Sequence, residues 1–206
     1  MESRTSKTEK QILDAADKVF QNKGFKNSKI SEIAELAGVN NALINYYFRS
    51  KENLFNKVLH AKIDLLAQSM SNVIDRNIAF CETIKDLVEA QFDFFRDNES
   101  LPRFILSEIL IDESRIDIFR ENVIPVIIRA NMDLDNRLRE EIAAGRVRNM
   151  EMFDLLYAIT SVNVLCFLVE PIFRGADMSS LFTLYSQVMN DRKKKNVEII
   201  MSYLKV

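Results

Sequence analysis

The chain has 206 residues, of which 48% are hydrophobic and 28% are charged. This balance is typical of a globular protein with a substantial core, and it excludes an intrinsically disordered chain. The formal net charge of −2 gives the chain as a whole no electrostatic preference for nucleic acid.

Glycine and proline, which interrupt helices, are rare in this chain, at 4 and 3 residues respectively. Elsewhere the apolar residues recur at the three- and four-residue spacing of amphipathic helices. Pro125 falls inside such a segment, so we expect it to kink or restart a helix. The sequence therefore predicts an all-α protein.

The first predicted helix begins at Thr8 and ends at Gly24. Thr8 and Gln11 have the spacing of a capping box, in which two side chains bond to each other's backbone N–H groups. The apolar residues that follow at helical spacing are Ile12, Ala15, Ala16, Val19 and Phe20.

Two short helices joined by a tight turn are predicted from Ile30 to Phe48. Gly38 lies where the chain must reverse, and glycine adopts a positive φ there without steric cost. We expect Ser28 to cap the first of these helices and Asn40 the second. Such a pair is typical of the helix-turn-helix, which places its second helix in the major groove of DNA. The residues expected on its inner side are Ile33, Leu36, Val39, Ile44 and Phe48.

The remaining sequence predicts only further helices. Ser50 is expected to cap a fourth helix that runs to Met70. Later helical segments are expected near residues 79–97, 101–111, 115–143, 151–170 and 178–204. The longest uninterrupted apolar run, Val164 to Val169, is far shorter than a membrane-spanning helix, so we expect no membrane partner. Because the N-terminal residues are polar and charged, we expect no signal peptide and a cytoplasmic location.

Taken alone, the pair of short helices also fits an ordinary helical hairpin of a larger bundle. The first quarter of the chain, however, resembles the tetracycline-repressor (TetR) family in a dense set of positions. They are Thr8, Ile12, Ala15, Ala16, Phe20, Gly24, Ile33, Ala34, Ala37, Gly38, Val39, Tyr47, Phe48, Ser50, Lys51, Glu52 and Leu54. The resemblance implies a three-helix helix-turn-helix domain that binds DNA (residues 1–50). It also implies a larger C-terminal helical domain for effector binding and dimerisation (residues 51–206).

The candidate DNA-binding residues come from the second helix of the pair and its flanks. An asparagine on the outward face can bond adenine at N6 and N7, and Asn41 and Asn45 share that face. Asn40 serves equally well as an N-cap or as a DNA contact. The resemblance implies that Tyr47 and Lys51 contact phosphates, and Lys51 also lies near a helix N-terminus, which favours anions. The complete candidate set is Lys29, Asn40, Asn41, Ala42, Asn45, Tyr46, Tyr47 and Lys51.

The distribution of charge agrees with a DNA-facing end. Residues 1–60 contain ten lysines and arginines against seven acidic residues, whereas the remainder is acidic. Catalysis has little support, because the only histidine is His60 and no phosphate-binding or nucleophile motif is present. We therefore expect no enzyme activity, no catalytic residues, no metal site and no cofactor.

The last two predicted helices carry apolar stripes that a dimer interface would bury. The candidate interface residues are Leu155, Ile159, Val162, Cys166, Leu181, Leu184, Val188 and Ile200. We therefore expect a homodimeric transcriptional repressor that an apolar or amphipathic small molecule releases from a palindromic operator. The alternative is a helical enzyme or small-molecule-binding protein whose N-terminal motif is coincidental. Salt-dependent retention on heparin or DNA distinguishes the two.

Overall fold

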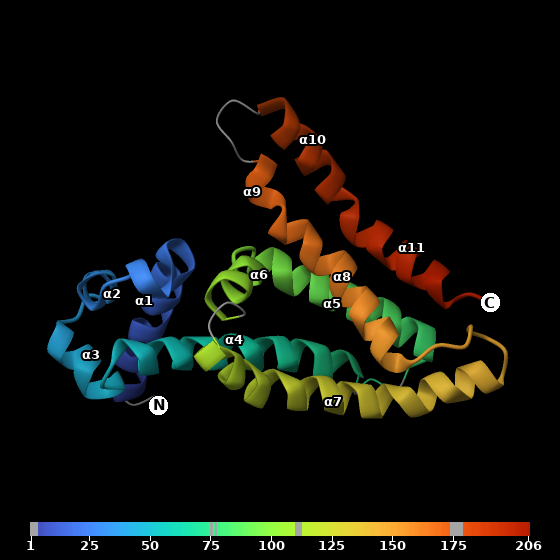
Figure 1. Cartoon of the computed structure of the whole chain (residues 1–206), viewed down its shortest axis with the longest axis horizontal. Coiled ribbons are helices and arrows are strands. Elements are labelled where there is room, and N and C mark those ends of the chain that lie inside the picture. Colours follow the sequence, from blue (N-terminus) through green and yellow to red (C-terminus); the bar gives the residue numbers. More distant parts are fainter. Residues whose placement is uncertain (1–3, 75, 77, 110–112, 174–178) are drawn as a thin grey trace. The chain divides into compact units, whose positions relative to one another are not determined.

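The computed structural model describes residues 4–74, 76, 78–109, 113–173 and 179–206. These residues form helices and turns without a β-strand, which confirms the all-α prediction (Figure 1). The chain packs into two units, Met1–Leu65 with Phe104–Asn122 and Leu66–Arg103 with Val123–Val206. The first unit thus takes in residues beyond the predicted DNA-binding domain 1–50, and the functional division at residue 50 stays a prediction.

The first unit contains α1 (Arg4–Asn27), α2 (Ile30–Ala37), α3 (Asn41–Phe48) and the first part of α4 (Lys51–Ile74). Helix α1 packs against α2, and α2 packs against α3 (Figure 1). Burial of apolar side chains from all four helices supplies the main stabilising free energy of this unit. Its most completely buried side chains are Ile12, Ala16, Phe20, Ile33, Ile44, Leu54, Phe55 and Leu59.

The start of α1 and the cap of α2 differ from the prediction. Helix α1 begins at Arg4, so Thr8 lies inside the helix and is not its N-cap. Helical backbone geometry is interrupted at Gly24, where φ is 71°, as the glycine there predicts. The N-cap residue of α2 is Lys29, because Ser28 is buried and its hydroxyl donates to the Phe25 carbonyl at 2.8 Å.

The turn between α2 and α3 agrees with the prediction at Gly38, which is left-handed with φ 67° and ψ 32°. Ile33, Ile44 and Phe48 are buried as expected, but Leu36 is 54% exposed. Leu36 lies two residues after the buried Ala34, about 200° further round the helix, so it points away from the core.

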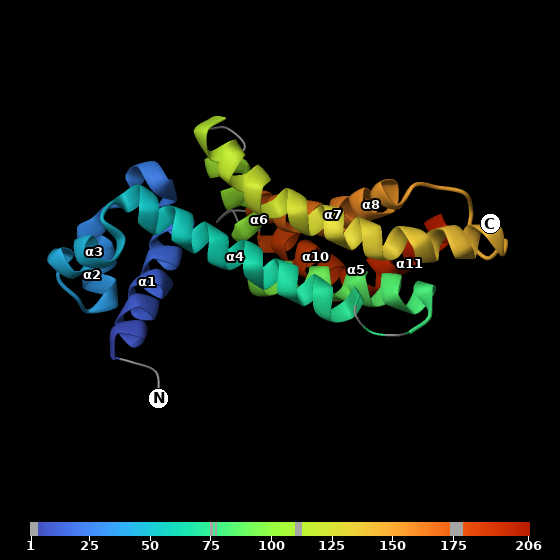
Figure 2. The ribbon, with the colours of Figure 1, turned by 90° about the horizontal axis from the view of Figure 1, so that it is seen from below.

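The second unit is built on α5 (Phe80–Asp97), α8 (Met152–Leu168) and α11 (Arg192–Leu204), which pack against one another (Figure 2). Leu134 and Leu138 of α7 (Glu113–Ala143) add to their core. Helix α7 continues through Pro125, so this proline does not restart a helix. The predicted segment 178–204 is divided at Asp191 into α10 (Ser179–Asn190) and α11.

Three short elements complete the described chain: α6 (Leu101–Phe104), the π-helical turn η1 (Ile105–Ile109) and α9 (Glu170–Phe173). The first two occupy most of the predicted segment 101–111, whose last two residues lie outside the described residues. Phe104 of α6 packs against Phe55 of α4 inside the first unit, with ring centroids 5.3 Å apart.

Side-chain amides cross the core of the second unit. Asn163 of α8 donates to the Val88 carbonyl at 3.0 Å and to Gln91 Oε1 at 3.1 Å. Asn196 of α11 donates to Asn163 Oδ1 at 2.8 Å and to the Val162 carbonyl at 3.0 Å. Because Asn163 and Asn196 are fully buried, these bonds fix how α5, α8 and α11 align.

The stretch that contains α8 and α9 corrects the expectation that no apolar stretch approaches membrane-spanning length. Within the described residues, Met152–Phe173 is 22 residues long, and an 18-residue window of it has a mean hydropathy of 1.9. Length and composition are weak evidence for a membrane span, because a core helix of a globular protein passes the same test. Leu155 and Ile159 of this stretch lie in the core, whereas Phe153, Tyr157 and Leu165 are exposed.

Candidate nucleic-acid interface

Helix α3 presents a polar face opposite its buried one. Ile44 and Phe48 anchor the helix in the core, while Asn41, Ala42 and Asn45 are exposed. This division follows from the 3.6-residue repeat, because Asn41 and Asn45 are four residues apart and share one side. The structure therefore brings together the side chains that the sequence proposes for reading base edges.

The adjacent tyrosines of α3 have different environments. Tyr46 is 77% exposed, and Tyr47 is half-buried beside Phe48, with ring centroids 6.2 Å apart. The two tyrosine rings meet edge to face at 5.3 Å. This contact restricts both rings at the surface, and their contact with DNA stays a prediction.

Side-chain caps begin both α3 and the helix that follows it, α4. Asn40 Oδ1 accepts a hydrogen bond from the Leu43 backbone N–H at 2.8 Å, which confirms Asn40 as the N-cap. Ser50 Oγ accepts from the Asn53 N–H at 3.1 Å and caps α4 in the same way. Asn40 is exposed as well, and its role as a DNA contact stays a prediction.

Lys51 lies at the start of α4 and is held in place by the turn between α1 and α2. Its Nζ donates to the Ser28 carbonyl at 2.7 Å and lies 4.4 Å from the centroid of the Phe25 ring. An ammonium has three N–H donors, so this bond positions the charge without using all of them. The predicted phosphate contact would draw on the others.

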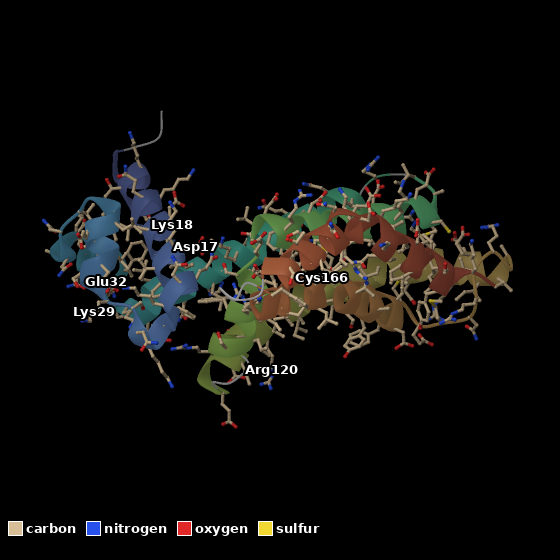
Figure 3. The ribbon with its side chains drawn as sticks, turned by 90° about the horizontal axis from the view of Figure 1, so that it is seen from above. Asp17, Lys18, Lys29, Glu32, Arg120 and Cys166 are labelled. Atoms are coloured by element: carbon tan, nitrogen blue, oxygen red, sulfur yellow. The ribbon has the colours of Figure 1, made fainter. Side chains whose placement is uncertain are left out.

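Ion pairing fixes the first turn of α2, where Figure 3 labels Lys29 and Glu32. Glu32 Oε1 accepts from Lys23 Nζ at 2.8 Å, and its other oxygen accepts from the Lys29 backbone N–H at 3.2 Å. The Lys23 bond, followed by the Lys29 bond, lowers the pKa of Glu32. The Lys29 side chain is exposed, as a phosphate contact requires.

Two arginines near this surface were absent from the sequence-derived set. Arg49 is exposed between α3 and α4 with φ 65°, the one positive φ among the non-glycine residues that the structure describes. A cation beside the predicted phosphate contact Lys51 is the sequence signal that could have found it. Arg115, at the start of α7, packs against Phe25 and Phe55 in the first unit. Because that contact joins residues far apart in sequence, local patterns carry no signal for it.

The predicted dimer residues fall into two groups. Leu155, Ile159 and Ile200 are at most 2% exposed in the core of a single chain, so they cannot form a surface for a second copy. They lie in the core cluster of the second unit. Leu184 and Val188 are exposed, Val162 and Cys166 are half-buried, and the Leu181 side chain lies outside the described residues.

Residues 12–58, which include α2 and α3, match the model of the tetR family of bacterial regulatory proteins. The N-terminal part of this chain is therefore similar to the TetR family. The helix-turn-helix lies inside this match, which confirms the resemblance seen in the sequence and argues against a chance helical hairpin.

The proteins similar to this chain include TetR-type and other helix-turn-helix regulators. The fatty acid metabolism regulator protein of Bacillus subtilis is 25% identical over 95% of this chain and 91% of its own length. The transcriptional regulator YttP of B. subtilis is 30% identical, but over 53% of this chain, which spans about half of YttP (54%). The structure of B. subtilis FadR in complex with stearoyl-CoA has the same fold, with a TM-score of 0.63 at 20% identity over 95% of this chain and 98% of that chain.

Proposed function

We propose that this chain is a sequence-specific DNA-binding transcriptional repressor of the TetR family, without enzyme activity, that acts in the cytoplasm. The observation that carries the proposal is the exposed polar face of α3, which Asn41, Asn45 and Tyr46 form on a buried apolar anchor. Lys29 directly precedes α2 and Lys51 begins α4, so each of these two helices has a positive charge at its N-terminus. A protein that only bound a small molecule would not need this combination.

The proposed contacts divide into two classes. Asn41 and Asn45 would bond base edges in the major groove, with adenine the best match for a bidentate amide. Lys29, Tyr47 and Lys51 would contact phosphates, which fix the register of the protein without reading sequence. Ala42 lies among the base-reading residues and is small enough to let the helix approach the groove closely.

We propose a homodimer whose interface uses the exposed apolar side chains of α8 and α10. Leu165, Leu184 and Val188 are 59%, 56% and 42% exposed in the single chain. Exposed apolar residues concentrated on neighbouring helices are typical of a surface that a partner covers. A twofold axis would relate the two α3 helices, so the operator would be a pseudo-palindrome.

We propose a long-chain acyl compound as the effector that releases the operator. The B. subtilis relative that spans nearly the whole chain is named for fatty acid metabolism, and FadR was solved with stearoyl-CoA. The second unit contains an aromatic cluster of Phe92, Phe95 and Phe167, which is compatible with an apolar ligand. The chemistry agrees with the apolar or amphipathic molecule predicted from the sequence.

The proposal is tested with purified protein and a DNA fragment selected from a random pool. Fluorescence anisotropy should show binding that weakens steeply with salt, and stearoyl-CoA should release the fragment while coenzyme A alone should not. Absence of salt-dependent DNA binding would favour the alternative of a helical small-molecule-binding protein. DNA binding that no acyl compound affects would overturn only the choice of effector.

A further inference from the structure

Arg115 is a buried cation in the first unit. It lies in the first turn of α7 and is 5% exposed. Its guanidinium carbon is 4.1 Å from the centroid of the Phe25 ring and 4.8 Å from that of Phe55. Its Nε lies 3.6 Å from Glu52 Oε1. Burying an arginine is costly, so contacts with two aromatic faces and one carboxylate indicate a defined position.

Phe25 contacts both Arg115 and Lys51, which is one of the candidate DNA-binding residues. The Lys51 ammonium also lies over the Phe25 ring, 4.4 Å from its centroid. Phe25 follows the helix break at Gly24, and its carbonyl accepts the Ser28 hydroxyl bond. The Ser28 carbonyl in turn accepts the Lys51 bond. Arg115 and Lys51 are thus joined through one ring and one short turn.

We infer that Arg115 is a positioning residue for DNA binding, which acts by holding the turn at Phe25 and thereby the Lys51 ammonium. The inference rests on the proposed function. Without the guanidinium, the Phe25 ring loses a cation on its face, and the turn that ends at Ser28 loses a support. The Ser28 carbonyl then no longer fixes Lys51, although Lys51 itself is unchanged.

The inference extends the DNA-binding apparatus beyond the helix-turn-helix. Arg115 is more than sixty residues from Lys51 in sequence, yet residues 104–122 pack within the same unit as residues 1–65. The start of α7 therefore becomes a part of the chain through which DNA affinity can be altered without touching the base-reading face of α3.

Four variants of the full chain test this: Arg115→Met, Arg115→Lys, Lys51→Met and the double variant Arg115→Met with Lys51→Met. Arg120→Met is the matched control, because Arg120 lies on the same helix, is exposed and pairs with Asp117 at 2.6 Å (Figure 3). The readouts are operator affinity, its dependence on salt, the selected base sequence and the thermal midpoint of unfolding.

Arg115→Met should weaken operator binding on the order of tenfold. It should also flatten the slope of log K against log salt by about one, the effect expected when one phosphate contact is lost. The selected base sequence should not change. In the Lys51→Met background the same substitution should have little further effect, because both variants remove one contact. Arg115→Lys should fall short of full rescue, since lysine cannot stack flat on two rings.

A folded Arg115→Met protein with the wild-type salt slope would overturn the inference. The inference would also fail if Arg115→Met lowered operator affinity equally in the wild-type and in the Lys51→Met background. If the methionine variant does not fold, the operator affinity and salt slope of Arg115→Lys provide the test in its place. Failure of both to fold would make Arg115 a purely structural residue and would also overturn the inference. If the wild-type protein binds no DNA, the proposed function itself fails.

Discussion

Asn45 is the residue whose replacement should most directly change which bases are bound. It is exposed on α3, four residues from Asn41. Replacing Asn45 with alanine should relax discrimination at one or two base pairs of each half-site by roughly 1–3 kcal/mol, because an amide that bonds adenine at two atoms is lost. Selection of binding sites from random DNA measures this directly. Asn53→Ala, which removes an exposed asparagine from α4, should leave the selected sequence unchanged.

The lowered pKa of Glu32 should make the stability of the protein depend on pH. Bonds from the Lys23 side chain and the Lys29 backbone lower its pKa in the folded protein. A carboxyl with a lowered folded pKa stabilises the protein above its unfolded pKa, and this stabilisation is lost as pH falls through the folded pKa. The difference in urea midpoint between wild type and Glu32→Gln should therefore be present at neutral pH and vanish in acid. A difference that is the same at all pH values would contradict this role.

At the scale of the helix, local sequence signals predict local features well. Gly38, Asn40 and Ser50 act through neighbours within four residues, so the positive φ and both caps could be predicted. Thr8 fits a cap equally well, but the helix extends past it to Arg4.

Features that depend on contacts between distant segments were not predictable from local patterns. Ile200 has the spacing of an interface residue and of a core residue alike, and α5 and α8 decide between them by burying it. Asn196 follows a run of charged residues in α11, yet Asn196 itself is buried against Asn163. Of the candidate site, exposure on α3 was predictable, whereas the contact of Lys51 with Ser28 and Phe25 was not.

The amide bonds among α5, α8 and α11 predict a large effect from one buried substitution. Asn163→Leu removes the partner of Asn196 and of Gln91 and leaves their amides with fewer hydrogen bonds in the core. The free energy of unfolding should fall by roughly 1–3 kcal/mol, the cost of unsatisfied buried polar groups. Urea denaturation measures it, with Asn136→Leu on the exposed side of α7 as the control. Equal stability of the two variants would show that the amides contribute nothing.

Recognition of a pseudo-palindromic operator by two α3 helices requires two copies of the chain. Leu165→Glu combined with Val188→Glu places charge on the exposed apolar faces of α8 and α10. Burying these carboxylates against a second copy should cost several kcal/mol and yield folded monomers with weak operator binding. Analytical ultracentrifugation gives the mass, and Ile128→Glu with Met132→Glu, on an exposed apolar part of α7, is the control. A double variant that remains dimeric would place the interface elsewhere.

Helix α3 of this chain is proposed to read a defined DNA sequence. The most direct measurement is selection of bound fragments from random double-stranded DNA with the full-length protein, followed by affinity measurement of the enriched sequence at two salt concentrations. We expect an inverted repeat with half-sites one helical turn or a multiple of it apart, bound at least about 10³-fold more tightly than random DNA. Enrichment of no sequence, with binding no tighter than about 10⁻⁴–10⁻⁶ M for every fragment, would contradict it.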